Sequence, residues 1–281
     1  MDLPLVVGVD GSTPALTAVD WAVDEAARHA LPLRLLYASL WERYEDTPPT
    51  DDDDVLTTAA ARAHRRDPDV PVTTDTVPDE AVDALLRAGH NASLLVTGSR
   101  GRGELQGLLL GSVGLAVAAR AHCPVIVVRG DMAGLAGTHE RILLGAGDPE
   151  SCADAVAFAF REARARRCVL DVVRAWRRPL HEPVDHPLLV GDPQQAHEQE
   201  ASELLDTLLR DATEDHPEVR VRRATVEGPA RRVLLDRSAA ADLVIVGARR
   251  RTGHLGLQLG RVAHTLLHHA ACPVAVVPQR A

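Results

Sequence analysis

The 281-residue chain contains no lysine, and its aromatic residues are few: two Phe, two Tyr and three Trp. Without lysine it cannot contain the GxxxxGK[ST] loop with which P-loop proteins hold phosphates. With 31 Arg against 40 acidic residues, the formal net charge is −9. An acidic chain without a basic, aromatic-rich surface is a poor nucleic-acid binder, so we expect no nucleic-acid partner.

Long apolar runs are also missing. No stretch approaches the roughly 20 apolar residues of a membrane helix. The first residues, MDLPLVVGVDGS, lack the basic and apolar regions of a signal peptide, because Pro4 and Asp10 interrupt the only apolar run. No two of the four Cys form a CxxC motif, which indicates reduced thiols. We therefore expect a cytoplasmic protein without a membrane partner.

Hydrophobic residues make up 46% of the chain, which is ample for buried cores. Because aromatic residues are scarce, those cores must consist mainly of Val, Leu and Ala. This composition is typical of parallel sheets covered by Ala-rich helices. The length predicts about two domains.

Apolar runs of strand length alternate with amphipathic stretches of helical length over the first half of the chain. The expected strands are residues 3–9, 33–38, 70–77, 93–97 and 125–128, and the expected helices are 14–29, 55–66, 79–88 and 112–121. This alternation predicts right-handed crossovers and an α/β fold with a doubly wound, five-stranded parallel sheet, Rossmann-like in kind. Ligands of such sheets bind at the carboxyl ends of the strands.

One stretch at such a carboxyl end has the composition of an anion-binding loop. Residues 93–113, SLLVTGSRGRGELQGLLLGSV, run from a strand through a glycine-rich loop into a helix. Glycine lets the main chain approach a ligand closely, and Ser112 is a favourable N-cap whose hydroxyl could also bind a phosphate oxygen. A helix N-terminus with loop N–H groups favours an anion such as phosphate. The alternative is a glycine-rich surface loop without a ligand.

The same pattern then recurs. Residues 142–146 repeat the first strand at an offset of 137, and residues 243–262 match residues 94–113 at an offset of 149. Cys123-Pro124 recurs as Cys272-Pro273 at the second offset. We therefore predict two copies of one domain, over residues 1–134 and 138–281, joined by a short Gly-containing linker at residues 131–138.

Both copies resemble the universal stress protein domain, and the whole chain resembles a tandem universal stress protein. In the first copy Gly98, Gly101, Gly111 and Ser112 meet the family's nucleotide signature, G-x2-G-x9-G-[ST]. The opening VVGVDGS matches the family as well. The resemblance also implies the fold of the related adenine-nucleotide α-hydrolases.

The resemblance implies that the first copy binds ATP, with Mg²⁺ held mainly by phosphate oxygens. Asp10 would hold the ribose, the backbone near Ala38 would contact adenine, and the glycine loop would lie along the nucleoside and its phosphates. The implied ATP-binding residues are Val9, Asp10, Ala38, Thr97, Gly98, Arg100, Gly101, Gly111, Ser112 and Val113.

The second copy departs from the signature at three positions. The second copy has Gly147 where the first has Asp10. It has Arg250 in place of Gly101, and Arg261 in place of Ser112. A side chain at position 250 lies where the loop favours positive φ, at a cost of about 1 kcal/mol or more. We therefore predict a degenerate nucleotide site in this copy. It serves as a structural partner, and its arginines either bind another anion or the acidic first copy, or form a solvated cluster without a ligand: Arg249, Arg250, Arg251 and Arg261.

Two other clusters contain metal-binding residue types. Residues 51–54 are four consecutive Asp, but they precede a helix, where acidic residues interact favourably with the helix dipole. His264 and His268 lie four residues apart on the expected last helix, without an HExxH motif. We assign neither as a metal site and expect no metal held by protein side chains.

The resulting functional prediction is an ATP-binding stress-response or regulatory protein, not an enzyme, with little or no turnover. No base or nucleophile stands beside Ser112, so we assign no catalytic residue. Two alternatives remain. A weak ATP hydrolase is the first, although the SGGxDS-type loop of the related α-hydrolases is absent. A nucleotide-independent interaction module is the second, and it describes the second copy better than the first.

The fifth strand of each copy lies at a sheet edge. In the family that the chain resembles, edge strands often pair about a two-fold axis, so residues 125–128 and 274–277 could pair within one chain and form an intramolecular pseudo-dimer. The sequence leaves a further homodimer open.

Overall fold

The computed structural model describes residues 3–39, 50–101, 110–148, 152–177, 193–249 and 259–279. Strands and helices alternate throughout the first repeat. Its elements are β1 (Leu5–Val9), α1 (Thr13–His29), β2 (Leu33–Ala38), α2 (Thr50–Arg66), β3 (Val72–Val77), α3 (Ala81–Ala88), the 3-10 turn η2 (Gly89–Asn91), β4 (Leu94–Gly98), α4 (Ser112–Arg120) and β5 (Val125–Val128).

The second repeat has the same order of elements and follows a short helix, α5 (Met132–Ala136). Its elements are β6 (Arg141–Gly145), α6 (Ala153–Arg166), β7 (Val169–Trp176), α7 (Pro193–Asp215), β8 (Arg220–Glu227), α8 (Ala230–Ser238), β9 (Leu243–Arg249), α9 (Arg261–His269) and β10 (Val274–Gln279).

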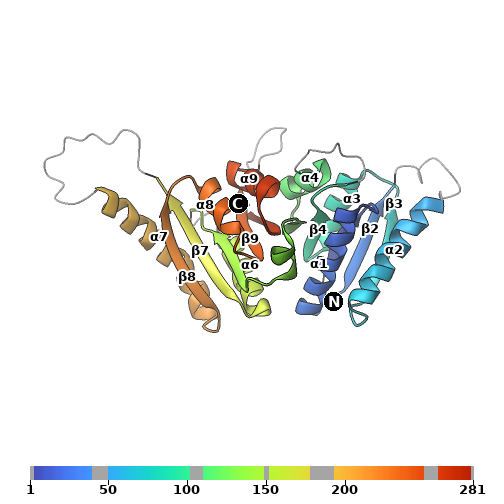
Figure 1. Ribbon diagram of the computed structural model, residues 1–281, viewed down its shortest axis with the longest axis horizontal. Helices are drawn as coiled ribbons and strands as arrows, with labels where there is room; N and C mark the ends of the chain where they lie inside the picture. The colour runs from blue at the N-terminus through green and yellow to red at the C-terminus, as the bar shows by residue number, and fades with distance from the viewer. Residues whose placement is uncertain are drawn as a thin grey trace.

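The strands of both repeats belong to one continuous sheet, ordered β3-β2-β1-β4-β5-β10-β9-β6-β7-β8 (Figure 1). All pairs within a repeat are parallel, which confirms the predicted doubly wound fold. The two five-stranded halves meet where β5 and β10 pair antiparallel, with Ile126 opposite Ala275. The sequence predicted this pairing of the two edge strands, and we call it the seam.

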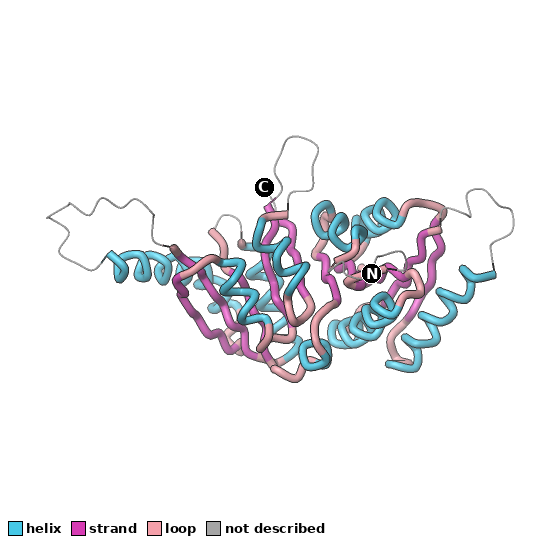
Figure 2. Tube along the Cα trace, turned by 45° about the horizontal axis from the view of Figure 1, so that its top comes forward, coloured by secondary structure: helices cyan, strands magenta, loops and turns pink. Residues whose placement is uncertain are grey.

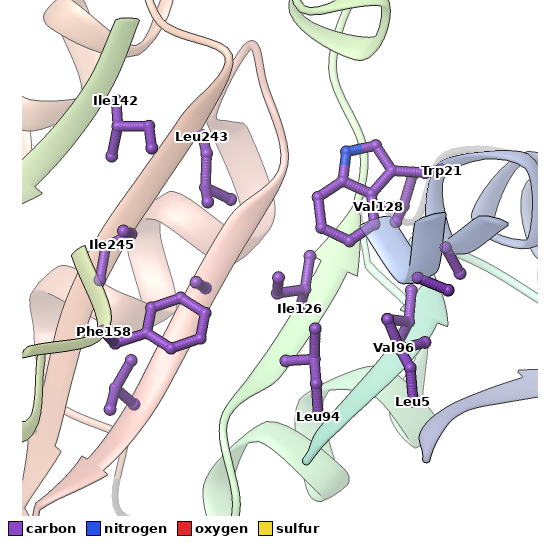
Figure 3. Packing of buried hydrophobic residues seen from close by; sticks show 14 of the residues in the cluster. Leu5, Trp21, Leu94, Val96, Ile126, Val128, Ile142, Phe158, Leu243 and Ile245 are labelled. Atoms are coloured by element: carbon purple, nitrogen blue, oxygen red, sulfur yellow. The ribbon is translucent and has the colours of Figure 1, made fainter. Parts of the chain in front are cut away.

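Helices cover both faces of the sheet (Figure 2). On one face α1, α2, α6 and α7 pack on a hydrophobic core that runs across the seam. On the other face a second hydrophobic core runs across the seam, and it is covered by α3, α4, α8 and α9. Figure 3 shows side chains of both repeats, among them Trp21, Ile126 and Phe158, in the first of these cores. Each core contains residues of both repeats, so apolar side chains of the two halves are buried together.

Local signals place the helix that follows β1. Asp10, Gly11 and Ser12 form a tight turn in which Gly11 has a φ of 77°. The side chain of Ser12 then caps α1 by accepting a hydrogen bond from the Ala15 N–H, and Pro14 occupies the first turn. The helix ends at a left-handed residue, Ala30. This turn brings Asp10 to the carboxyl edge of the sheet.

The structure differs from the sequence prediction at several boundaries. The first strand begins at Leu5, because Leu3 is 49% exposed. The third strand begins at Val72 and the third helix at Ala81, slightly later than predicted, whereas α2 begins earlier, at Thr50. The side chains of the four Asp at residues 51–54 lie outside what the structure describes, so the metal hypothesis for them remains untested.

The segment between the repeats is a docked helix and not a plain linker. The Asp131 side chain caps α5 by accepting a hydrogen bond from the Gly134 N–H, and Gly137 ends the helix with a φ of 68°. The Asp131 N–H donates to the carbonyl of Ala271 in the second repeat. Arg129 donates to the carbonyl of Ala270 at 2.9 Å, so it caps the carboxyl end of α9.

All four cysteines are buried and unbridged. Burial raises the pKa of Cys123 to about 11 and that of Cys272 to about 12, and it also raises the pKa of Cys152 and Cys168. Since the thiolate is the reactive form, we expect no fast reaction with Ellman's reagent at about pH 8 in the folded protein. All four thiols should react in denaturant, and a fast-reacting thiol in the folded protein would contradict this prediction.

Candidate functional site

All ten residues implied by the glycine signature line one cavity of about 380 Å³ in the first repeat. The cavity lies at the carboxyl ends of β1, β2 and β4, where the N-terminus of α4 meets the sheet. Strand β1 ends at Val9 and Asp10 follows it directly, β2 contributes Ala38, and β4 contributes Thr97 and Gly98. The loop after β4 and the start of α4 supply the rest: Arg100, Gly101, Gly111, Ser112 and Val113.

Asp10 has a fixed orientation at the mouth of this cavity. Its Oδ1 accepts a hydrogen bond of 2.9 Å from the Ser12 N–H, which closes a local turn after β1. Ser12 Oγ also lies 3.5 Å from the carbonyl oxygen of Arg100, which joins this turn to the glycine loop. The carboxylate is therefore held beside the loop that follows β4.

Two glycines of the signature allow close approaches that a side chain would prevent. A Cβ at Gly98 would lie 2.7 Å from the backbone carbonyl of Pro14 at the start of α1. A Cβ at Gly101 would lie 2.6 Å from Asp10 Oδ2. The first glycine thus lets β4 pack against α1, and the second lets the loop reach the Asp10 carboxylate.

The N-terminus of α4 opens into the cavity without a side-chain cap. Gly111, and not Ser112 as predicted, is the N-cap residue, and Ser112 is the first residue of the helix. Glycine has no side chain to accept hydrogen bonds from the first helical N–H groups. These donors and the positive end of the helix dipole are thus directed at whatever occupies the cavity.

The cavity also contains features that the sequence analysis missed. Thr97 Oγ1 is buried and has no hydrogen-bond partner among the described residues, an arrangement that is uncommon unless a ligand or water supplies one. Leu36, Ala81 and Leu85 give the cavity an apolar wall. The amphipathic pattern of α3 could have identified Leu85, but nothing in the sequence links Thr97 to an unmet hydrogen bond.

The second repeat contains a corresponding cavity of about 840 Å³ with different chemistry. Arg174 lies 3.3 Å from Asp148 Oδ1 and donates a hydrogen bond to the carbonyl of Gly147, so the acidic group is engaged by the protein itself. Arg261 takes the place of Ser112 as the first residue of α9, after the N-cap Gly260. The side chain of Arg249, together with Arg250 and Arg251, lies outside the described residues.

Comparison with known proteins agrees with this architecture. The model of the universal stress protein family matches residues 3–129 and again residues 138–278. The chain belongs to the universal stress protein family. The two matched segments correspond to the two repeats, each with its own cavity at the carboxyl edge of the sheet.

Similar universal stress proteins occur in Mycobacterium tuberculosis. One is 33% identical over 291 residues, covering 98% of this chain and 97% of that protein. Another is 31% identical over 289 residues, which cover 98% of this chain and 96% of that protein. Among solved structures, a universal stress protein from Archaeoglobus fulgidus has a TM-score of 0.66 at 16% identity, covering 99% of this chain and 98% of that one. The likeness to these proteins therefore extends over nearly the whole of this chain.

None of the helices in the described ranges combines the length and the hydrophobicity that a bilayer-spanning segment requires.

Proposed function

We propose that the first repeat of this universal stress protein binds ATP as a regulatory ligand and turns it over little or not at all. The observation that carries the proposal is the uncapped N-terminus of α4, which opens into the cavity that Asp10 borders. A helix N-terminus favours phosphate, and a carboxylate at the carboxyl edge of a parallel sheet suits ribose hydroxyls. The two groups together fit a nucleotide better than a simple anion.

Each part of the cavity has a role in this proposal. The apolar wall of Leu36, Ala81 and Leu85 accommodates the adenine ring, which the backbone near Ala38 contacts at its edge. Asp10 accepts hydrogen bonds from the ribose, and the unpartnered hydroxyl of Thr97 bonds the nucleoside. The N–H groups at the start of α4 hold the phosphates, together with the Ser112 hydroxyl.

The residues present also fit Mg²⁺ bound through the nucleotide. Asp10 is the only carboxylate among the described residues that line the cavity, and it already accepts the Ser12 N–H. One carboxylate does not form a dedicated metal cage, whereas phosphates commonly hold Mg²⁺ with few protein ligands. The metal would neutralise phosphate charge next to the helix N-terminus.

The proposed absence of turnover rests on the chemistry of the lining. The described lining residues include no His, Lys, Cys or Glu, and the one carboxylate among them, Asp10, is assigned to the ribose and not to a base. A bound nucleotide would then act by favouring one conformation of the protein. We further propose that the two repeats work as an intramolecular pseudo-dimer across the seam, with the second repeat supporting the first.

Calorimetric titration of nucleotide-stripped protein with Mg-ATP tests the proposal. We expect one site per chain in the wild type. Gly111→Val should weaken binding at least tenfold, about 1.4 kcal/mol, because its branched side chain crowds the phosphate position at the start of α4. Gly260→Val is the matched control, since it makes the same change at the N-cap of α9 and should leave binding unchanged.

Two outcomes would change the interpretation. Two sites per chain would show that the second repeat binds nucleotide despite Arg261. If Mg-ATP gives no heat of binding with the wild type and does not change its thermal stability, nucleotide binding is rejected. The interaction module is then the favoured function.

A further inference from the structure

A cluster of buried charges lies where α1 of the first repeat packs against α6 of the second. Glu25 is fully buried, and Glu162 is only 3% exposed. The two glutamates occupy the same position in their repeats, at the offset of 137 residues. One helical turn later α1 carries His29 and α6 carries Arg166, so the repeats differ in the cation that follows the glutamate.

The two oxygens of each glutamate have different neighbours. Glu25 Oε1 and Glu162 Oε1 lie 3.3 and 3.2 Å from His29 Nε2. The outer oxygens face arginine instead: Arg166 lies 2.6 Å from Glu25 Oε2 and 3.4 Å from Glu162 Oε2, and Arg28 also contacts Glu25 Oε2. Arg166 therefore fixes both carboxylates with their inner oxygens directed at His29.

Two of the three inner atoms lack normal hydrogen bonds despite their burial. Among the described residues, Glu25 Oε1 and His29 Nε2 are buried polar atoms without a hydrogen-bond partner of acceptable geometry. Such atoms are uncommon in proteins and often mark a missing ion or water.

We propose that Glu25 Oε1, His29 Nε2 and Glu162 Oε1 bind a divalent transition-metal ion, best matched by Zn²⁺, which ties the two repeats together. The three ligand atoms lie within 4.8 Å of one another. Tetrahedral Zn²⁺ with bonds of about 2.0 Å places its ligands about 3.3 Å apart, close to the two distances from His29 Nε2.

The surroundings suit such a site. A nitrogen donor beside two carboxylates favours zinc and its neighbours over Mg²⁺ or Ca²⁺, which prefer oxygen alone. Arg166 binds the outer carboxylate oxygens in the way that outer-shell groups orient metal ligands. The side chain of His29 is 24% exposed, so the site lies close to the surface although Nε2 itself is buried. The sequence analysis expected no protein-held metal and did not recognise this cluster.

Metal titration of chelator-stripped protein tests the proposal, with Co²⁺ as a spectroscopic substitute for Zn²⁺. We expect one Co²⁺ per chain with the intense visible absorption of a tetrahedral complex, displaced by Zn²⁺. Zinc should also raise the Tm of the wild type, because it binds only the folded protein. The affinity of Glu162→Gln should fall by more than the roughly 10–100-fold that loss of an outer-shell group costs.

His29→Arg is the decisive variant, because it gives α1 the same Glu and Arg pair that α6 carries. It keeps a cation between the carboxylates but removes the metal-binding nitrogen, so the protein should stay folded and lose both the Co²⁺ spectrum and the zinc-dependent rise in Tm. A His264→Gln, His268→Gln double variant removes the adjacent His pair of α9, on the opposite face of the sheet, and should bind as the wild type does.

The competing occupant of the site is a proton on His29 that bridges the two carboxylates. If the wild type takes up no Co²⁺ at micromolar concentration, or if His29→Arg binds it equally well, the metal proposal is wrong. The cluster is then an ion-pair network between the repeats.

Discussion

Replacing Gly130 with alanine is expected to destabilise the protein by about 3 kcal/mol or more. This glycine follows β5 and has a φ of 110°, which side-chain-bearing residues rarely adopt. A Cβ there would lie 2.2 Å from the carbonyl oxygen of Ala271, a backbone atom of the second repeat. The backbone strain of about 1–2 kcal/mol therefore adds to an overpacking cost of about 1–3 kcal/mol. Urea unfolding of the two proteins measures the difference.

Gly137→Ala is the matched control for this prediction. Gly137 also has positive φ, 68°, but a Cβ there meets nothing within 4 Å. The substitution should therefore destabilise the protein only through backbone strain, by about 1 kcal/mol. If the two variants lose the same free energy of unfolding, the segment at α5 does not hold the repeats as closely as the contact between Gly130 and Ala271 indicates.

Phe160→Ala is expected to lower the free energy of unfolding by about 3–5 kcal/mol. Phe160 is fully buried on α6 and belongs to the core that crosses the seam. Because the two repeats share this core, the loss should reach the first repeat. Hydrogen exchange should therefore show reduced protection in β1 as well as in β6, by similar amounts.

Met132→Ala provides the control, because Met132 is 81% exposed and should change stability by about 0.5 kcal/mol or less. If Phe160→Ala weakens protection in β6 and leaves β1 unchanged, the repeats unfold independently, and the seam contributes little coupling between them.

The sequence could predict the fold because the signals were local and repeated. Apolar runs of strand length alternating with Ala-rich helices define a parallel α/β sheet, and the recurrence at fixed offsets showed that the chain does this twice. The ten residues that the family resemblance implied all line one cavity, because strand ends and the glycine loop meet at one edge of the sheet; their contact with a nucleotide stays a prediction.

What the sequence could not predict depends on contacts between distant residues. The helix cap was placed one residue too late, because serine is usually the better cap and nothing local shows that Gly111 starts the helix. The Arg174 contact that engages Asp148 joins strand β7 to the segment after β6. The charges around Glu25 and Glu162 come from helices of different repeats, and only a position-by-position comparison of α1 and α6 would have paired them.

The docked helix α5 has a consequence for how the two cavities could evolve. Two separate copies of one domain find each other only by diffusion, so their association weakens on dilution, and a symmetric pair must contain two identical cavities. Here the covalent connection through Asp131 keeps the second repeat at a fixed, high effective concentration beside the first. One half of the molecule can therefore differ from the other at the signature positions, and every chain carries one cavity of each kind.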